Sequence, residues 1–292
     1  MQIKHERRAE IGERLAQLGD RRPGVGLRNE LPDIVWCPVP GGHVTLSDGA
    51  TTVLGAVEVQ PFYIAQYPVT LQQFTVFTQK FTVFTQSRIY FNKEWWTGLA
   101  IDPDHHPPYA QTPEIPNHPA QYVSWYQAMA FCNWLSQQLK YPVRLPTEWE
   151  WVQAATGGHA DYLYPWGPTW DPDKANHKEG LYRLMSVGMY PQGKSSVGAF
   201  DMSGNMYQWC LNEYDDPTNV EHGSTQPHTT RGGAFFTMPG IDKVQKQLSI
   251  RHRLRDNPDG MRDDGRRLAV CMRLVCDNPP PETVLCLPLA PP

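Results

Sequence analysis

The sequence predicts an irregular, loop-rich α+β fold, and three observations lead to this prediction. The 292 residues include 28 prolines and 23 glycines, which interrupt regular elements and mark turns. There are also 13 tyrosines and 10 tryptophans, so large side chains are available to fill a core between short elements. Finally, three helix-start signals stand among short β-rich runs, which is the pattern of an α+β domain.

The first 30 residues are predicted to form a helix and a linker outside the main domain. Residues 3–18 have the pattern of a short amphipathic helix, and Gly19 supplies a stop signal. Residues 21–27 contain a proline and two glycines, which predict an extended linker. The helix would act as a cap or as an arm that docks on a partner. Its apolar residues are Ile3, Ile11, Leu15 and Leu18.

The main domain is expected to cover residues 31–276, followed by a Pro-rich tail at 277–292. Two β-rich runs within residues 34–46 flank the sequence Pro-Gly-Gly at positions 40–42, which predicts a hairpin. A further strand is expected over residues 57–65. The domain therefore begins with β structure.

Three helices are predicted from capping boxes, in which a Ser or Thr and a Gln or Glu three residues later bond to each other's backbone. In the second, apolar residues follow at the helical period, and the third is expected to stop at Gly157. The pairs are Thr70 with Gln73, Ser124 with Gln127, and Thr147 with Glu150.

A tandem repeat follows the first of these helix starts. The hexapeptide Phe-Thr-Val-Phe-Thr-Gln occurs at residues 74–79 and again at 81–86. A shift of seven residues is nearly two helical turns, so a continuous helix would keep the phenylalanines of both copies on one face. Two interpretations are open: a duplication without a role, or an aromatic face that binds a partner.

Composition excludes several functional classes. The formal net charge of −4 leaves no basic footprint for nucleic acid. We find neither a signal peptide nor an apolar run of membrane-spanning length, so we expect a soluble, cytoplasmic protein without membrane contacts. The cysteines form no CxxC pair, so we expect six reduced thiols without a zinc site or a disulfide framework. They are Cys37, Cys132, Cys210, Cys271, Cys276 and Cys286.

Three blocks near the C-terminus carry the most information. Residues 201–209 read Asp-Met-Ser-Gly-Asn-Met-Tyr-Gln-Trp, residues 231–236 read Arg-Gly-Gly-Ala-Phe-Phe, and residues 271–275 read Cys-Met-Arg-Leu-Val. The first two combine turn-forming residues with apolar neighbours, which predicts tight turns next to buried strands. In this order, the blocks resemble the formylglycine-generating enzyme family, also called the sulfatase-modifying-factor domain.

Further blocks extend this resemblance over about residues 32–275, and it implies an elaborated C-type lectin fold. They lie at residues 68–70, 118–119, 123–125, 144–149, 164–167 and 186–188.

The resemblance also implies a copper site that this chain lacks the ligands to build. In the family, two cysteines shortly after the Arg-Gly-Gly block bind copper and oxidise a substrate cysteine, but residues 234–242 contain no cysteine. Cys271 and Cys276 lie downstream, and residues five apart in a strand point to opposite faces. We therefore predict no catalytic residue and no copper site.

Two other metals occur in relatives of this family. Calcium is bound there by oxygens of the block that here spans residues 201–209, but Gln208 replaces the usual glutamate and leaves Asn205 as the remaining ligand. Iron-dependent relatives use a histidine cluster, whereas His105, His106 and His118 lie in a Pro-rich loop without the spacing of ligands. We expect no bound cofactor.

The sequence is most similar in style to the variable proteins of diversity-generating retroelements. These resemble the enzymes in framework, lack their cysteines, and diversify the segment between the second and third blocks to change partner. Here that segment is rich in arginine and aspartate, and it is predicted to form the recognition surface. The expected ligand-binding residues are Phe235, Phe236, Arg251, His252, Arg253, Arg255, Asp256, Asn257, Asp259, Arg262, Asp263, Asp264, Arg266 and Arg267.

The sequence therefore favours a non-catalytic protein that binds a protein or other macromolecular ligand, because arginine and aromatic side chains supply much of the energy of interfaces. Two alternatives stay open. One is an oxidoreductase of the formylglycine-generating type that acts on a protein cysteine. The other is a pseudoenzyme subunit of a larger assembly, docked through the helix at residues 3–18. A plain polar surface loop is the competing interpretation of residues 251–267.

Overall fold

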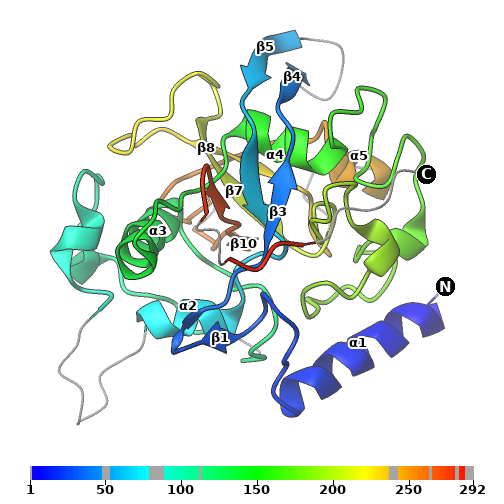
Figure 1. Cartoon of the computed structure of the whole chain (residues 1–292), viewed down its shortest axis with the longest axis horizontal. Coiled ribbons are helices and arrows are strands. Elements are labelled where there is room, and N and C mark those ends of the chain that lie inside the picture. Colours follow the sequence, from blue (N-terminus) through cyan, green and yellow to red (C-terminus); the bar gives the residue numbers. More distant parts are fainter. Residues whose placement is uncertain are drawn as a thin grey trace.

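The computed structural model describes residues 2–47, 53–78, 89–111, 114–236, 243–262, 265–279 and 283–286. Within these ranges the chain forms five α-helices and eleven short strands, which confirms the predicted α+β class (Figure 1). No described helix has the length and apolar character needed to cross a membrane. The helices are α1 (Gln2–Gln17), α2 (Leu71–Thr78), α3 (Trp125–Leu139), α4 (Glu148–Thr156) and α5 (Val244–Leu248).

A four-stranded sheet brings the three C-terminal blocks together. Its strand order is β10-β7-β8-β9, with β10 parallel to β7 and the other pairs antiparallel. The first block leads into β7, the second begins at the last residue of β8, and the third begins in β10. The strands are β7 (Tyr207–Glu213), β8 (His228–Arg231), β9 (Arg253–Asp256) and β10 (Val270–Cys271).

The prediction of a hairpin at residues 40–42 is wrong, and the structure has a bent two-stranded ribbon there. The chain continues through Pro40 from β3 (Trp36–Val39) into β4 (Gly42–Ser47). These strands pair with β6 (Phe62–Ala65) and β5 (Val53–Val59), respectively, in the same antiparallel register from Trp36 to Leu46, and the register shifts between Leu46 and Ser47. Proline has no backbone N–H for the ladder, so Pro40 and Pro61, which lie opposite each other in this register, interrupt it. The strand predicted over 57–65 is split at the same place.

The remaining strands are short and complete the periphery. β1 (Leu27–Arg28) pairs with β2 (Leu31–Pro32), and β11 (Val275–Cys276) joins β6. The predicted linker at 21–27 is packed against the domain, because Gln73 of α2 donates hydrogen bonds to the carbonyls of Gly24 and Gly26.

The predicted helix starts are confirmed in detail. Ser124 Oγ accepts from the backbone N–H of Gln127 (3.1 Å), and the Gln127 side chain accepts from Ser124 N (3.0 Å). The boxes at Thr70 and Thr147 are formed in the same way. Helix α4 ends at Gly157, which adopts φ 62°, a conformation that glycine reaches without a Cβ clash.

Helix α1 is a cap, and part of its apolar face packs against residues 185–190 of the main domain. Ala9 packs in a buried cluster with Met185, Met189 and Tyr190, and a 2.6 Å hydrogen bond joins His5 Nδ1 to the Tyr190 hydroxyl. Ile11 and Leu18 remain exposed by 46% and 66%, respectively. In Figure 1, the helix lies along the lower edge of the molecule.

The first copy of the tandem repeat belongs to the core. Phe74 and Phe77 are buried in α2 and contact Phe131, with ring centroids 5.8 and 5.7 Å away. The second copy, at residues 81–86, lies outside the described residues. The interpretation of the repeat as an exposed aromatic face is therefore wrong for its described part.

One cysteine pair contradicts the prediction of six reduced thiols. Cys37 and Cys286 form a disulfide across 249 residues of sequence. They meet because the segment before Cys286 lies along β3, where Trp36 N donates to the carbonyl of Val284 (3.1 Å) and Cys286 N donates to that of Trp36 (2.9 Å). Neither contact leaves a spacing signal in the sequence. The other four cysteines are buried free thiols.

A matched pair of glycine substitutions tests the packing at the start of β7. Gly204 and Gly98 have nearly equal positive φ values, 84° and 82°. A Cβ at Gly98 meets no atom within 4 Å, whereas one at Gly204 would clash with the carbonyl oxygen of Asn176. We expect Gly98→Ala to cost about 1 kcal/mol of unfolding free energy and Gly204→Ala to cost clearly more. Urea unfolding of both variants measures this, and equal losses would contradict the predicted clash.

Candidate functional site

The turns of the first two blocks are bonded to each other where β7 begins and β8 ends, the two inner strands of the four-stranded sheet. Gly204 N donates to the carbonyl of Gly232 (2.7 Å), and Phe235 N donates to that of Asn205 (3.1 Å). Gly232 and Gly233 both have positive φ, 97° and 73°, so the backbone can reverse after β8 without a steric penalty. This arrangement carries Phe235 and Phe236 to the start of β7.

Four of the predicted site residues line one small hollow of about 80 Å³, which we call the C-terminal hollow. They come from three different segments: the end of the second block, β9, and the loop that follows it. The rest of the wall is provided by β7, β9 and the approach to β10. The four are Phe236, Asp256, Arg262 and Arg267, and the others are Tyr207, Leu254, Leu268, Ala269 and Val270.

The hollow contains a buried acid beside basic side chains. Asp256 is 5% exposed and accepts a hydrogen bond from Thr230 Oγ1 (2.6 Å). Burial raises the pKa of its carboxyl group to about 6, although the charge of Arg262 acts in the opposite direction. Burial also raises the pKa of Tyr207, which keeps this phenol protonated.

Aromatic side chains continue from the hollow to the surface. The rings of Phe235 and Phe236 meet edge to face with centroids 5.1 Å apart, and Phe236 also contacts Tyr207. Phe235 lies 6.3 Å from the ring of Tyr182, which is 60% exposed. A strip of aromatic surface therefore borders the hollow.

The loop after β9 is held by its own polar groups. The Asn257 side chain donates to the carbonyl of Met261 (3.1 Å), and Asp259 Oδ1 accepts from Met261 N (2.9 Å). Arg262 N donates to the carbonyl of Arg266 (2.7 Å), which closes a tight turn. Asn257 and Asp259 thus shape the loop. Asp263 and Asp264 lie outside the described residues.

The two arginines at the end of the loop are exposed. Arg267 lines the hollow and stacks its guanidinium group over the ring of Tyr109. Arg266 lies next to it, at the end of the turn. These two residues present positive charge at the surface beside the hollow.

The remaining predicted site residues do not share one surface. Arg253 is only 7% exposed, so its assignment to a solvent-facing surface is wrong. Arg255 is exposed on the same side of β9 and lies 3.3 Å from Asp215. Since alternate residues of a strand face opposite sides, Leu254 and Asp256 face the hollow while Arg253 and Arg255 do not. This alternation was readable from the sequence.

Two further residues lie apart from the loop. His252 is half-buried beside the Tyr207 hydroxyl (3.4 Å), and burial lowers its pKa to about 4. Arg251 lines a different cavity. Neither residue lines the C-terminal hollow.

Glu148, for which the sequence predicted no role, is the partner of two buried arginines, Arg231 and Arg253. Its carboxylate, fully buried at the start of α4, accepts from Arg231 Nε (2.8 Å) and from Arg253 Nε and Nη2 (both 2.9 Å). Two guanidinium groups therefore share one carboxylate. Only the pairing of distant segments reveals this contact, since 83 and 105 residues separate the partners.

The calcium ligands expected from the resemblance do not fit a cation. Asn205 Oδ1 accepts hydrogen bonds from Met185 N (3.1 Å) and from the Asn176 side chain (3.0 Å). Gln208 Oε1 accepts from Trp151 Nε1 (3.1 Å) and Arg273 Nε (2.8 Å). Because N–H donors already surround both oxygens, a hard cation would meet positive charge there.

The downstream cysteines are equally unsuited to copper. Cys271 lies in β10 and Cys276 in β11, which belong to different sheets. Burial raises the pKa of each thiol to about 12, whereas Cu(I) is bound by thiolates. Among the described residues, no group of three or more His, Cys, Asp or Glu side chains is placed to hold a metal ion.

The α+β scaffold and its hollow bordered by arginine and aromatic side chains can now be compared with known proteins. The sulfatase-modifying factor enzyme 1-like domain model matches residues 25–270. The chain belongs to this family, which confirms the resemblance found in the sequence.

Among curated proteins, the chain is 31% identical to the inactive C-alpha-formylglycine-generating enzyme 2 of Bos taurus over 130 residues, which is 40% of this chain and 41% of that protein. It is 29% identical to the formylglycine-generating enzyme of Thermomonospora curvata over 146 residues, covering 41% and 46%. Each match therefore spans less than half of the relative's length.

Two solved structures share the fold. Treponema denticola variable protein 1 has a TM-score of 0.57 at 18% identity, with 83% of this chain and 95% of that chain covered. PvdO from Pseudomonas aeruginosa has a TM-score of 0.56 at 19% identity, with 88% and 100% covered. At these identities the likeness establishes the C-type lectin fold of the variable protein.

Substitution of Glu148 tests the buried charge cluster. Glu148→Gln keeps the shape of the side chain but leaves Arg231 and Arg253 buried without a counter-charge. We expect a loss of about 3–5 kcal/mol in unfolding free energy, measured by urea denaturation. As a control, Glu58→Gln alters a side chain that is 66% exposed and should change stability by less than about 0.5 kcal/mol. Similar effects of the two changes would contradict this role of Glu148.

The raised pKa of Asp256 predicts a pH-dependent difference between the wild type and Asp256→Asn. The folded wild type binds the Asp256 carboxyl proton more tightly than the unfolded chain does. Protonation of Asp256 therefore stabilises the folded state at low pH, and this contribution is lost as pH rises through about 6. Relative to the wild type, the unfolding free energy of the variant should increase by up to about 3 kcal/mol between pH 4 and pH 7, because folding raises the pKa of Asp256 from 3.8 to about 6.

Unfolding of both proteins by urea at several pH values measures this difference. Buried histidines with lowered pKa values, such as His252, are common to both proteins and cancel in the comparison. A difference that stays constant with pH would show that Asp256 titrates normally.

Proposed function

We propose that this protein is a non-catalytic binding protein whose recognition surface is formed by the C-terminal hollow and its aromatic and arginine border. The observation that carries the proposal is the convergence of Phe236, Arg262 and Arg267 from separate segments around the buried Asp256. Tyrosine, tryptophan and arginine anchors dominate the binding energy of protein interfaces, especially around desolvated pockets. This corner of the molecule offers such a combination.

The dimensions favour a macromolecular partner. The hollow measures about 80 Å³, well below the roughly 300–1,000 Å³ typical of small-molecule pockets. It can accept one protruding side chain, while the aromatic strip and the exposed arginines contact the surface around it. A partner with an acidic patch complements Arg266 and Arg267, because charges of opposite sign steer association.

We further propose that the segment between the second and third blocks determines which partner is bound, as in the variable proteins that the sequence resembles. The rigid framework supports this idea, since Asn257 and Asp259 fix the loop by local bonds and the side chains beside them can change without disturbing the sheet. A reverse transcriptase gene with an adjacent template repeat in the genomic neighbourhood is the expected sign of diversification, and the absence of both would refute it.

The central experiment compares partner binding by two charge-reversed proteins. Partners are captured from a lysate of the native organism with the full chain, cross-linked and identified by mass spectrometry, and the affinity of a purified partner is then measured. Arg262→Glu, Arg266→Glu and Arg267→Glu together should weaken binding at least tenfold, which corresponds to about 1.4 kcal/mol. Phe235→Ala should also weaken it.

A matched control makes the same change in charge elsewhere. Arg7, Arg14 and Arg21 are exposed in or near α1, and their reversal to Glu should leave the affinity unchanged. The opposite pattern, with loss only in the α1 triple variant, would favour docking through the N-terminal helix. Oxidation of a cysteine-containing peptide by the purified protein would instead favour an oxidoreductase.

A further inference from the structure

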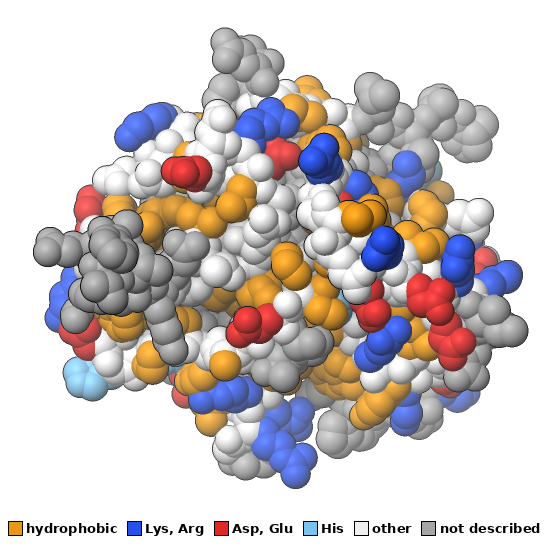
Figure 2. Space-filling model, turned by 90° about the horizontal axis from the view of Figure 1, so that it is seen from below, with side chains coloured by type: hydrophobic (Ala, Val, Ile, Leu, Met, Phe, Trp, Pro, Cys, Tyr) orange, Lys and Arg blue, Asp and Glu red, His pale blue; other side chains and the backbone are white. Residues whose placement is uncertain are grey.

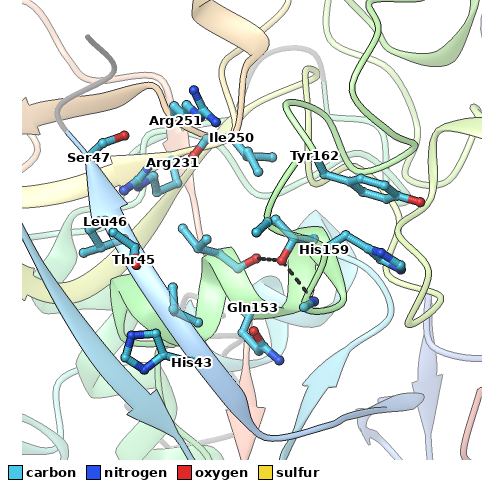
Figure 3. A pocket seen from close by; sticks show the side chains of 15 residues that line it. His43, Thr45, Leu46, Ser47, Gln153, His159, Tyr162, Arg231, Ile250 and Arg251 are labelled. Atoms are coloured by element: carbon cyan, nitrogen blue, oxygen red, sulfur yellow. Dashed lines mark hydrogen bonds between the residues drawn. The ribbon is translucent and has the colours of Figure 1, made fainter. Parts of the chain in front are cut away.

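A second and larger cavity, of about 420 Å³, lies between β4 and α4 and shares no lining residue with the C-terminal hollow. Its volume falls within the range of small-molecule sites. Figure 3 shows β4 on one side, α4 below, and the loop after α4 on the other side, with Arg231 and Arg251 at the upper end. The proposed recognition surface does not use this cavity.

The electrostatic character of the cavity is one-sided. Of its fifteen described lining residues, two are arginines and two are histidines, and none is Asp or Glu. Arg251 is exposed at the rim. Such a lining favours an anionic ligand, because a cleft with charges of one sign concentrates ions of the other.

Arg231 supplies a positive charge at the wall of the cavity. It is 1% exposed, and its Nε and Nη1 atoms donate to Glu148 and to the carbonyl of Ile250. Nη2 lies 2.6 Å from Glu148 Oε1, yet it has no hydrogen-bond partner of acceptable geometry among the described residues. Because Arg253 shares the same carboxylate, the cluster keeps one excess positive charge.

The other end of the cavity is aromatic. The rings of His159 and Tyr162 stack with centroids 4.5 Å apart and planes inclined by 14°, and Figure 3 shows them across the cavity from the arginines. Ile250 and Leu46 add apolar surface. On β4, the buried residues Val44 and Leu46 alternate with His43, Thr45 and Ser47, so the two sets lie on opposite sides of the strand.

We propose that this cavity binds a small aromatic oxyanion, with its carboxylate or phosphate group at Arg231 and Arg251 and its ring against His159 and Tyr162. Charge-assisted hydrogen bonds from guanidinium groups suit both kinds of anion. The site would give the protein a small-molecule ligand in addition to its macromolecular partner.

Titration calorimetry with phenyl phosphate and with benzoate, in a low-chloride buffer, tests the proposal and separates the two anions. We expect saturable binding of at least one probe at one site per chain. Arg251→Gln should weaken it at least tenfold, since a hydrogen bond to a charged group contributes about 1.5–3 kcal/mol. Arg7→Gln, an exposed arginine on α1, is the matched control and should bind like the wild type.

A second variant tests the aromatic end. Tyr162→Ala should weaken phenyl phosphate binding but leave the weaker binding of inorganic phosphate unchanged, because inorganic phosphate has no ring to contact. Absence of binding by both aromatic probes at millimolar concentration would overturn the proposal, as would equal affinities of Arg251→Gln and the wild type. These outcomes are independent of partner binding, which depends on Arg262, Arg266 and Arg267.

Discussion

The C-terminal hollow and the cavity beside β4 both depend on the ion pairs that the buried carboxylate of Glu148 forms with Arg231 and Arg253. Glu148 is the first residue of α4 and binds Arg231 at the end of β8 and Arg253 at the start of β9. Its backbone N–H also donates to Asn212 of β7 (2.5 Å). One acidic residue thereby fixes a helix against three neighbouring strands. Removing a partner from such a cluster leaves buried charge uncompensated, so the four elements are held in one arrangement.

The alternation of β9 distributes its side chains between two environments. Arg253 points toward α4 and Glu148, while Leu254 and Asp256 line the C-terminal hollow. Arg251, just before the strand, reaches the cavity beside β4. A small displacement of β9 would therefore disturb both the hollow and the cavity. On the face shown in Figure 2, basic and acidic side chains are interspersed over the described surface, and neither sign forms a continuous patch there.

The sequence predicted local features and family membership better than it predicted contacts between distant segments. Capping boxes such as that of Ser124 and Gln127 are local and were recovered in detail. The hairpin prediction is wrong because Pro40 and the two following glycines resemble a turn, whereas β3 pairs with β6, whose residues lie 23 to 29 positions further along the chain (Val39 with Phe62, Trp36 with Ala65). The Cys37–Cys286 disulfide and the buried role of Arg253 depend on long-range packing, for which one sequence contains no direct signal.

Hydrogen bonds between buried side chains hold the framework together around Gln208. Gln208 receives Arg273 and Trp151, and Arg273 also donates to the carbonyl of Ala65 in β6 (2.7 Å). A neutral amide at this position joins the two sheets without requiring an ion, although burial lowers the pKa of Arg273 to about 10. The loop between β9 and β10 adds its own local bonds to this framework, from the Asn257 side chain to the carbonyl of Met261 and from Met261 N to Asp259 Oδ1. Because these bonds lie within the loop, they fix its backbone independently of the contacts that join the sheets.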